Sequence, residues 1–169
     1  MKRFRWILLL TACWLCGACG SGSDTKDNGL TVGQLSGTWR LKSWTGEAQN
    51  PDGTSYTFSD VVYVYMELGE DNTFTLYQNV STAGAAKFSG TYSLNDTAVS
   101  GYYLSGSGVT AWSDSYTIGG FTANSMIWTA VHAPGDVQEF VRVDSVPQEV
   151  LDAVNGVRSA VAPSVRGIL

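Results

Sequence analysis

The chain has 169 residues and a formal net charge of −5; 15% of its residues are charged, 12% are aromatic and 19 are glycine. This length suits a single domain with short additional segments, and the composition favours β-sheet over helix. The chain is acidic and has no cluster of Lys and Arg of the kind that phosphate binding requires, which argues against nucleic acid as a partner.

Residues 1–18 are typical of a secretory signal, with a basic start and an apolar run too short for a membrane-spanning helix. The segment resembles a bacterial lipoprotein signal in which Cys19 becomes lipidated, and the polar residues 19–33 then form a flexible tether. Two alternatives stay open: lipidation of Cys13, or an ordinary cleaved signal that leaves a free thiol. Together with Cys16 these are the only cysteines, so the domain that follows is expected to have no disulfide and no cysteine metal site.

Residues 34–144 contain runs of alternating apolar and polar residues separated by turn residues, the pattern of short β-strands. Sequential strands joined by short turns favour an antiparallel meander, and eight of them can close into an up-and-down barrel. Residues 48–60 are expected to form a long loop. The eight expected strands span residues 35–47, 61–68, 73–80, 87–94, 99–105, 111–118, 126–132 and 137–143.

A short helix is expected at residues 145–157, where Ser145 can cap the first turn and Gln148 follows three residues later. Its apolar positions form one stripe, which predicts packing on the outside of the sheet. The stripe consists of Val146, Val150, Leu151 and Val154. Residues 158–169 show no periodicity and are expected to be a loose tail.

Four features of the chain occur in an order that resembles a known family. They are the glycine and tryptophan of Gly37-Thr38-Trp39, the hairpin at 68–74, the segment 88–92 and the late strand with Arg142. The family is the lipocalin-like domain lipoproteins of Gram-negative bacteria, within the calycin group. The resemblance implies an all-β barrel with Trp39 at its closed end, a cation from Arg142 across the indole, and close chain approach at Gly37. The alternative is that Trp39 is ordinary core and Arg142 is solvated.

No catalytic constellation is found in the sequence. His132 is the only histidine, which excludes a histidine zinc cluster, and its setting indicates an exposed or packing residue. The carboxylates Glu67, Glu70 and Asp71 surround a hairpin and are expected to form the turn and aid solubility rather than bind calcium. We therefore expect no enzyme, no metal and no cofactor.

Large apolar side chains on the inward strand faces are candidates to line a small-ligand pocket, or simply to fill the barrel. They are Met66, Phe74, Tyr92, Tyr116, Met126, Trp128 and Phe140. An outward patch of tyrosines could instead dock a protein or glycan partner; it would consist of Tyr63, Tyr65, Tyr77 and Tyr103.

Two functions follow from these interpretations. The first is a lipid-anchored protein of the bacterial cell envelope, on the periplasmic face or surface of the outer membrane, that binds a small apolar or amphipathic ligand. The alternative is a structural or interaction module, an accessory subunit or inhibitor, that docks an envelope partner through loops or the tyrosine patch.

Overall fold

The computed structural model describes residues 29–49, 53–80, 84–105, 108–156 and 169. The predicted signal segment, the lipidation site Cys19 and the alternative site Cys13 lie outside the described residues. Of the predicted loose tail, only Leu169 is described.

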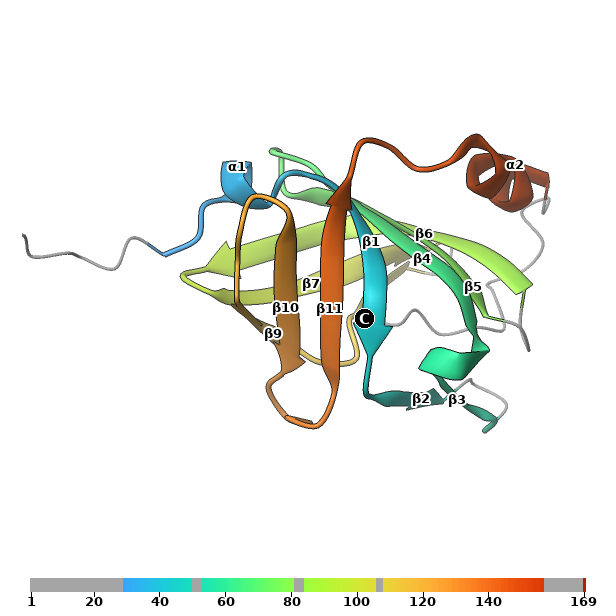
Figure 1. The fold of residues 1–169 in the computed structure, drawn as a ribbon, viewed down its shortest axis with the longest axis horizontal. Helices are drawn as coiled ribbons and strands as arrows, with labels where there is room; N and C mark the ends of the chain where they lie inside the picture. Colours follow the sequence, from blue (N-terminus) through green and yellow to red (C-terminus); the bar gives the residue numbers. More distant parts are fainter. Residues whose placement is uncertain (1–28, 50–52, 81–83, 106–107, 157–168) are drawn as a thin grey trace, which may run out of the picture.

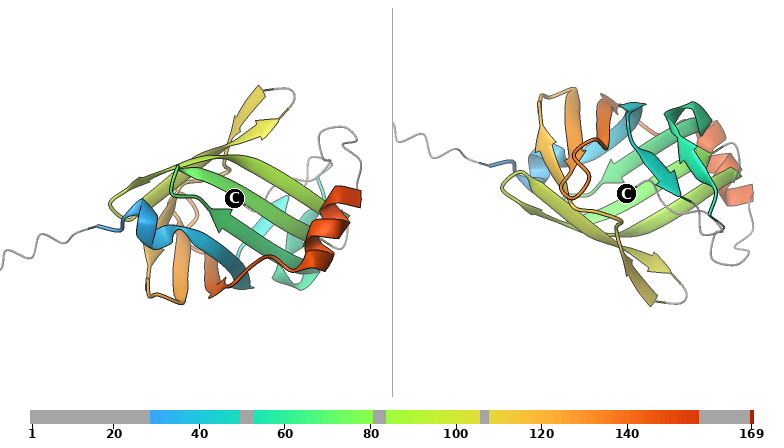
Figure 2. Two further views of the ribbon diagram at one scale, coloured as in Figure 1. Left: turned by 90° about the horizontal axis from the view of Figure 1, so that it is seen from above. Right: turned by 90° about the horizontal axis from the view of Figure 1, so that it is seen from below.

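Eight antiparallel strands close into a barrel, which confirms the predicted fold (Figures 1 and 2). Most neighbouring strands of the ring follow one another in the chain. The first and last strands also pair, along most of their length. The short β8 lies outside the ring. Pairing of β6 with β7 and of β7 with β9 completes the ring. The eight strands are β1 (Gly37–Trp44), β4 (Val61–Leu68), β5 (Thr73–Val80), β6 (Gly84–Asn95), β7 (Ala98–Ser105), β9 (Tyr116–Gly119), β10 (Ser125–Ala130) and β11 (Val137–Val143).

Short elements decorate the barrel. The segment expected to be one long loop holds β2 (Glu47–Gln49) and β3 (Ser55–Thr57), which pair as a small sheet, and the 3-10 turn η1 (Phe58–Asp60). Helix α1 (Val32–Leu35), which was not predicted, precedes β1 and begins with a capping box formed by Thr31 and Gln34.

The prediction of a single strand at residues 111–118 is wrong. The chain instead forms β8 (Gly108–Ala111), which pairs only with β7 outside the ring, and then β9 within it. Between them the carboxylate of Asp114 accepts the backbone N–H groups of Ser115 and His132, at 2.7 and 3.0 Å. This side-chain turn competes with strand pairing and breaks the run in two.

The alternation expected for the 61–80 hairpin is confirmed. Val64, Met66 and Leu68 of β4 point inward, as do Phe74 and Leu76 of β5. These side chains alternate with outward residues because successive strand residues face opposite sides of a sheet.

A bulge in β1 changes which tryptophan faces inward. The pairing with β11 shifts register between Leu41 and Ser43, so the alternation skips one residue and Trp44 is buried instead of Ser43. Trp44 packs against Tyr56 at 5.8 Å between ring centroids and donates to Asp136 at 2.7 Å. Strict alternation from Trp39 would place Trp44 on the outer face, but the bulge turns it inward, and its indole anchors the 48–60 segment to the barrel.

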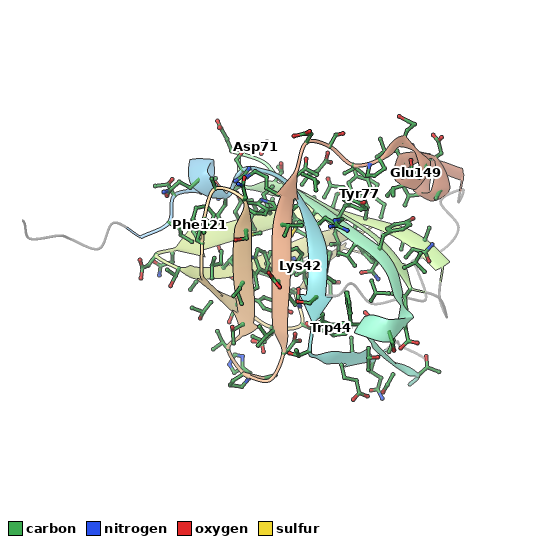
Figure 3. All side chains as sticks on the ribbon, viewed as in Figure 1. Lys42, Trp44, Asp71, Tyr77, Phe121 and Glu149 are labelled. Carbon is green, nitrogen blue, oxygen red and sulfur yellow. The ribbon has the colours of Figure 1, made fainter. Side chains whose placement is uncertain are left out.

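Helix α2 (Gln148–Gly156) follows the last strand and packs on the outside of the barrel, as predicted (Figure 1). Val150 and Val154 of the helix, and Val146 just before it, cluster with Tyr77. Tyr63 and Tyr65 pack against that cluster. Figure 3 shows Tyr77 on the side of the barrel that α2 covers. The predicted outward tyrosine patch is therefore not a free surface, because the helix occupies it.

Candidate functional site: the barrel floor and interior

One end of the barrel is closed around Trp39, which is fully buried and lies opposite Arg142 in the β1–β11 pairing. The indole N–H donates to the Leu35 carbonyl of α1 at 2.8 Å, so the short helix is tied to the floor. Phe121 packs on the same indole, with ring centroids 6.3 Å apart. Figure 3 shows Phe121 at the α1 end of the barrel, and Trp44 toward the β2–β3 end.

Arg142 lies over the Trp39 ring, with its guanidinium carbon 4.2 Å from the ring centroid. It donates to three carbonyls from two other segments: Ser36 at 2.6 Å, Gln34 at 2.8 Å and Ala123 at 2.7 Å. A guanidinium has five donors in a fixed plane, so one side chain can satisfy all three acceptors and still cover an aromatic face.

Gly37 lies directly beside this guanidinium. Its φ of 130° is a backbone conformation that favours glycine, and a Cβ added there would collide with the Arg142 side chain. The three residues that the resemblance singled out thus meet at one point. Their arrangement is structural, because each of the three guanidinium nitrogens donates to a main-chain carbonyl.

The seven predicted interior residues are all buried in one continuous core cluster. Trp128 stands at the centre of an aromatic group and packs on Tyr116 at 5.6 Å and on Phe140 at 5.4 Å between ring centroids. Its indole N–H points to the sulfur of Met126 at 3.1 Å. The residues predicted to line the interior therefore do lie together inside the barrel.

The interior hydroxyls are mostly engaged by the protein itself. The Tyr92 hydroxyl donates to the Gly69 carbonyl at 2.9 Å. Burial raises the pKa of Tyr116 to about 12, against the opposing effect of hydrogen bonds with Ser113 and Gln138. Both groups are neutral at physiological pH and stabilise the barrel wall.

Two aromatic residues that sequence reasoning missed also face the interior. Trp112 was assigned to a continuous strand, but it lies inside and packs on Trp128 at 6.0 Å and edge-on to Phe74 at 5.1 Å. Tyr103 was assigned to the outer face, but it lies in the core beside Phe74 and Phe88. The alternation Val99-Gly101-Tyr103 carried the signal for Tyr103, although glycine in the middle weakened it.

The indole N–H of Trp112 is buried and has no hydrogen-bond partner among the residues that the structure describes. A buried donor without an acceptor costs about 1–3 kcal/mol of stability. This donor is the feature of the interior that a bound molecule with an oxygen acceptor would satisfy.

The other polar candidates are surface features. His132 is exposed and pairs with Asp114 at 2.7 Å. Partial burial raises the pKa of Asp114, but hydrogen bonds from His132 and Ser115 outweigh burial and lower that pKa below its ordinary value. Asp71 accepts the Thr73 N–H and hydroxyl, as a turn residue does. Within the described parts of the chain no group of His, Cys, Asp or Glu is arranged to hold a metal ion, and no described helix is long and apolar enough to span a membrane.

A family model for the lipocalin-like domain matches residues 35–128. No curated protein matches the chain. Among solved structures, a lipocalin-like protein from Bacteroides uniformis has a TM-score of 0.44 and 19% identity, covering 65% of this chain and 99% of its own. An uncharacterized protein from Bacteroides eggerthii has a TM-score of 0.39 and 16% identity, covering 64% of this chain and 98% of its own. The matched segment of the family model runs from the end of α1 to Trp128 in β10.

Proposed function

The chain belongs to the lipocalin-like domain family, and we propose that it binds a small apolar or amphipathic molecule inside the barrel. We further propose that a lipid on Cys19 holds it in the bacterial cell envelope, at the outer membrane. The first proposal depends on the barrel interior and the second on the segment before the barrel, so each is tested separately.

The observation that carries ligand binding is the indole N–H of Trp112, which has no partner among the described residues and lies in a core made mainly of apolar and aromatic side chains. Small-molecule sites combine apolar and aromatic walls with a few polar groups that orient the ligand. A ligand with an oxygen acceptor would pair with this N–H while its apolar part replaces contacts within the aromatic group.

The test is a titration of the folded protein with 1-aminoanthracene, a neutral aromatic probe, followed by displacement with 2-nonanone, which has an aliphatic chain and a carbonyl. We expect saturable binding of the probe with one site per chain, and competition by 2-nonanone. Trp112→Phe keeps an aromatic ring but removes the N–H, and should weaken 2-nonanone binding by about fivefold or more.

The matched control is Trp44→Phe, because the Trp44 indole already donates to Asp136 near the β2–β3 end. It should leave the affinity for 2-nonanone unchanged. Absence of saturable binding by either compound would refute ligand binding in the interior, and equal effects of the two substitutions would remove Trp112 from the site.

The anchor is tested by metabolic labelling with an alkyne fatty acid in a bacterial host, followed by membrane fractionation. We expect label on the full chain in the outer-membrane fraction, and its loss in Cys19→Ala. Cys13→Ala and Cys16→Ala are the matched controls and should keep the label. Label that survives Cys19→Ala but disappears in Cys13→Ala would overturn the assignment.

A further inference from the structure

Leu169 lies inside the barrel although α2, the last described element before it, lies outside. Its side chain is fully buried and belongs to the same core cluster as Trp128 and Phe74. The end of the chain, marked C, falls within the outline of the barrel in every view (Figures 1 and 2). An aliphatic group from a segment outside the eight strands therefore occupies the space that they enclose.

A polar contact holds Leu169 in this position. The hydroxyl of Tyr103 on β7 donates to the main-chain oxygen of Leu169 at 3.1 Å, in a buried setting. Tyr103 packs edge-on to Phe74 at 5.6 Å, and Trp112 packs edge-on to the same ring at 5.1 Å. The interior thus holds two donors beside one phenyl ring: the Tyr103 hydroxyl, paired with Leu169, and the unpaired Trp112 indole.

We propose that Leu169 is an internal occupant of the barrel, and that a ligand with an aliphatic body and an oxygen acceptor binds by displacing it. This inference rests on the ligand binding proposed above, and adds the chemical class of the ligand and the residue with which it competes. Leu169 itself displays that chemistry, a branched aliphatic group with an oxygen atom next to it.

Two donors in the interior select an oxygen acceptor. The Tyr103 hydroxyl donates to the oxygen of Leu169, and the Trp112 indole N–H has no partner among the described residues. Among the described residues no charged side chain is buried, so a buried ammonium would lack an anion.

Occupancy is measured first, on the wild-type chain without any ligand. The methyl resonances of Leu169, assigned with Leu169→Ala, should be shifted upfield by the surrounding aromatic rings. The methyls of Leu104, which is 57% exposed on β7, serve as the matched control and should lie near random-coil positions. Random-coil shifts for Leu169 would overturn the inference, whether or not any ligand binds.

Displacement is measured next by titrating 2-nonanone, nonanoate and nonylammonium. In the wild-type chain 2-nonanone and nonanoate, which both carry an oxygen acceptor, should bind more tightly than nonylammonium, which has none, and should move the Leu169 methyls to random-coil positions. Leu169→Ala should bind 2-nonanone about tenfold more tightly, since the competing burial of a leucine corresponds to roughly that factor or more. Leu104→Ala should bind like the wild type.

The outcomes separate the two proposals. Tight binding of 2-nonanone that is equal in the wild type and Leu169→Ala would refute the competition and leave ligand binding intact. Shielded Leu169 methyls with no binding of any probe by either protein would refute ligand binding, and with it the ligand class proposed here. Tighter binding of nonylammonium than of 2-nonanone or nonanoate would overturn the oxygen acceptor.

Discussion

Replacing Arg142 by alanine is expected to lower the free energy of unfolding by about 3 kcal/mol. The hydrogen bond to the Ser36 carbonyl is partly buried, and a bond from a charged donor of this kind contributes about 1.5 kcal/mol or more. The carbonyls of Gln34 and Ala123 are exposed and can be rehydrated, so their two bonds add only about 0.5 kcal/mol each. The cation over the Trp39 indole supplies roughly another 0.5–1 kcal/mol.

The free energy of unfolding of Arg142→Lys should lie between those of the wild-type chain and Arg142→Ala. An ammonium keeps the positive charge near the indole, but it is a point donor on a flexible stem and cannot reach three carbonyls in one plane. We expect it to recover about half of the loss, by keeping the cation–π contact and one hydrogen bond.

The assay is urea denaturation of the wild-type chain, Arg142→Ala and Arg142→Lys, monitored by tryptophan fluorescence. With a slope of about 1.5 kcal/mol/M, a loss of about 3 kcal/mol moves the midpoint down by roughly 2 M urea. Arg40→Ala is the matched control, because Arg40 is exposed on β1 one residue from Trp39 and should change stability by less than about 0.5 kcal/mol. An Arg142→Ala midpoint equal to that of Arg40→Ala would show that the floor does not depend on the guanidinium.

Three further substitutions test other parts of the structure. Gly37→Ala should destabilise by about 1–3 kcal/mol, because φ is 130° and the new methyl collides with the guanidinium, whereas Gly33→Ala meets no neighbour in α1 and should be neutral or slightly stabilising in the same urea assay. The free energy of unfolding should fall as pH rises from about 10 to about 12, because the unfolded chain releases the Tyr116 proton near its ordinary pKa while the folded chain retains it up to about 12. Tyr116→Phe should flatten that fall, and an unchanged slope would contradict the burial argument. Val150→Ala on α2 should cost about 1–2 kcal/mol by loosening the helix from the tyrosine face, and a cost below about 0.5 kcal/mol would mean that the helix does not pack there.

Local alternation predicted the ring of strands well, because most of them carry a clear two-residue period. The strands at 61–68, 73–80 and 137–143 were predicted with the bounds that the structure has. The floor could be anticipated through family resemblance, and Arg142 does lie on Trp39. A cation far along the chain and an indole near its start share no local pattern that would place them together.

The misses have physical reasons that a pattern of residues does not contain. The bulge that turns Trp44 inward is a defect in pairing with β11, and neither strand shows it alone. Tyr103 lies on the same strand face as the buried Val99, and its exposed neighbour Tyr102 lies on the opposite face. A tyrosine suits either face of a strand, so residue type alone does not tell the two apart. Leu169 sits in a stretch without periodicity, so its burial depends entirely on contacts with distant strands.

Closure between the first and last strands has a kinetic consequence. The guanidinium that secures the floor bonds a carbonyl 106 positions earlier in the chain, and β1 must wait for β11 as its second partner. A chain that is still being synthesised and lacks β11 therefore leaves one long side of β1 unpaired, a template for aggregation until the last strand arrives. Such non-local pairing slows folding, so we expect this barrel to form late and in one concerted step.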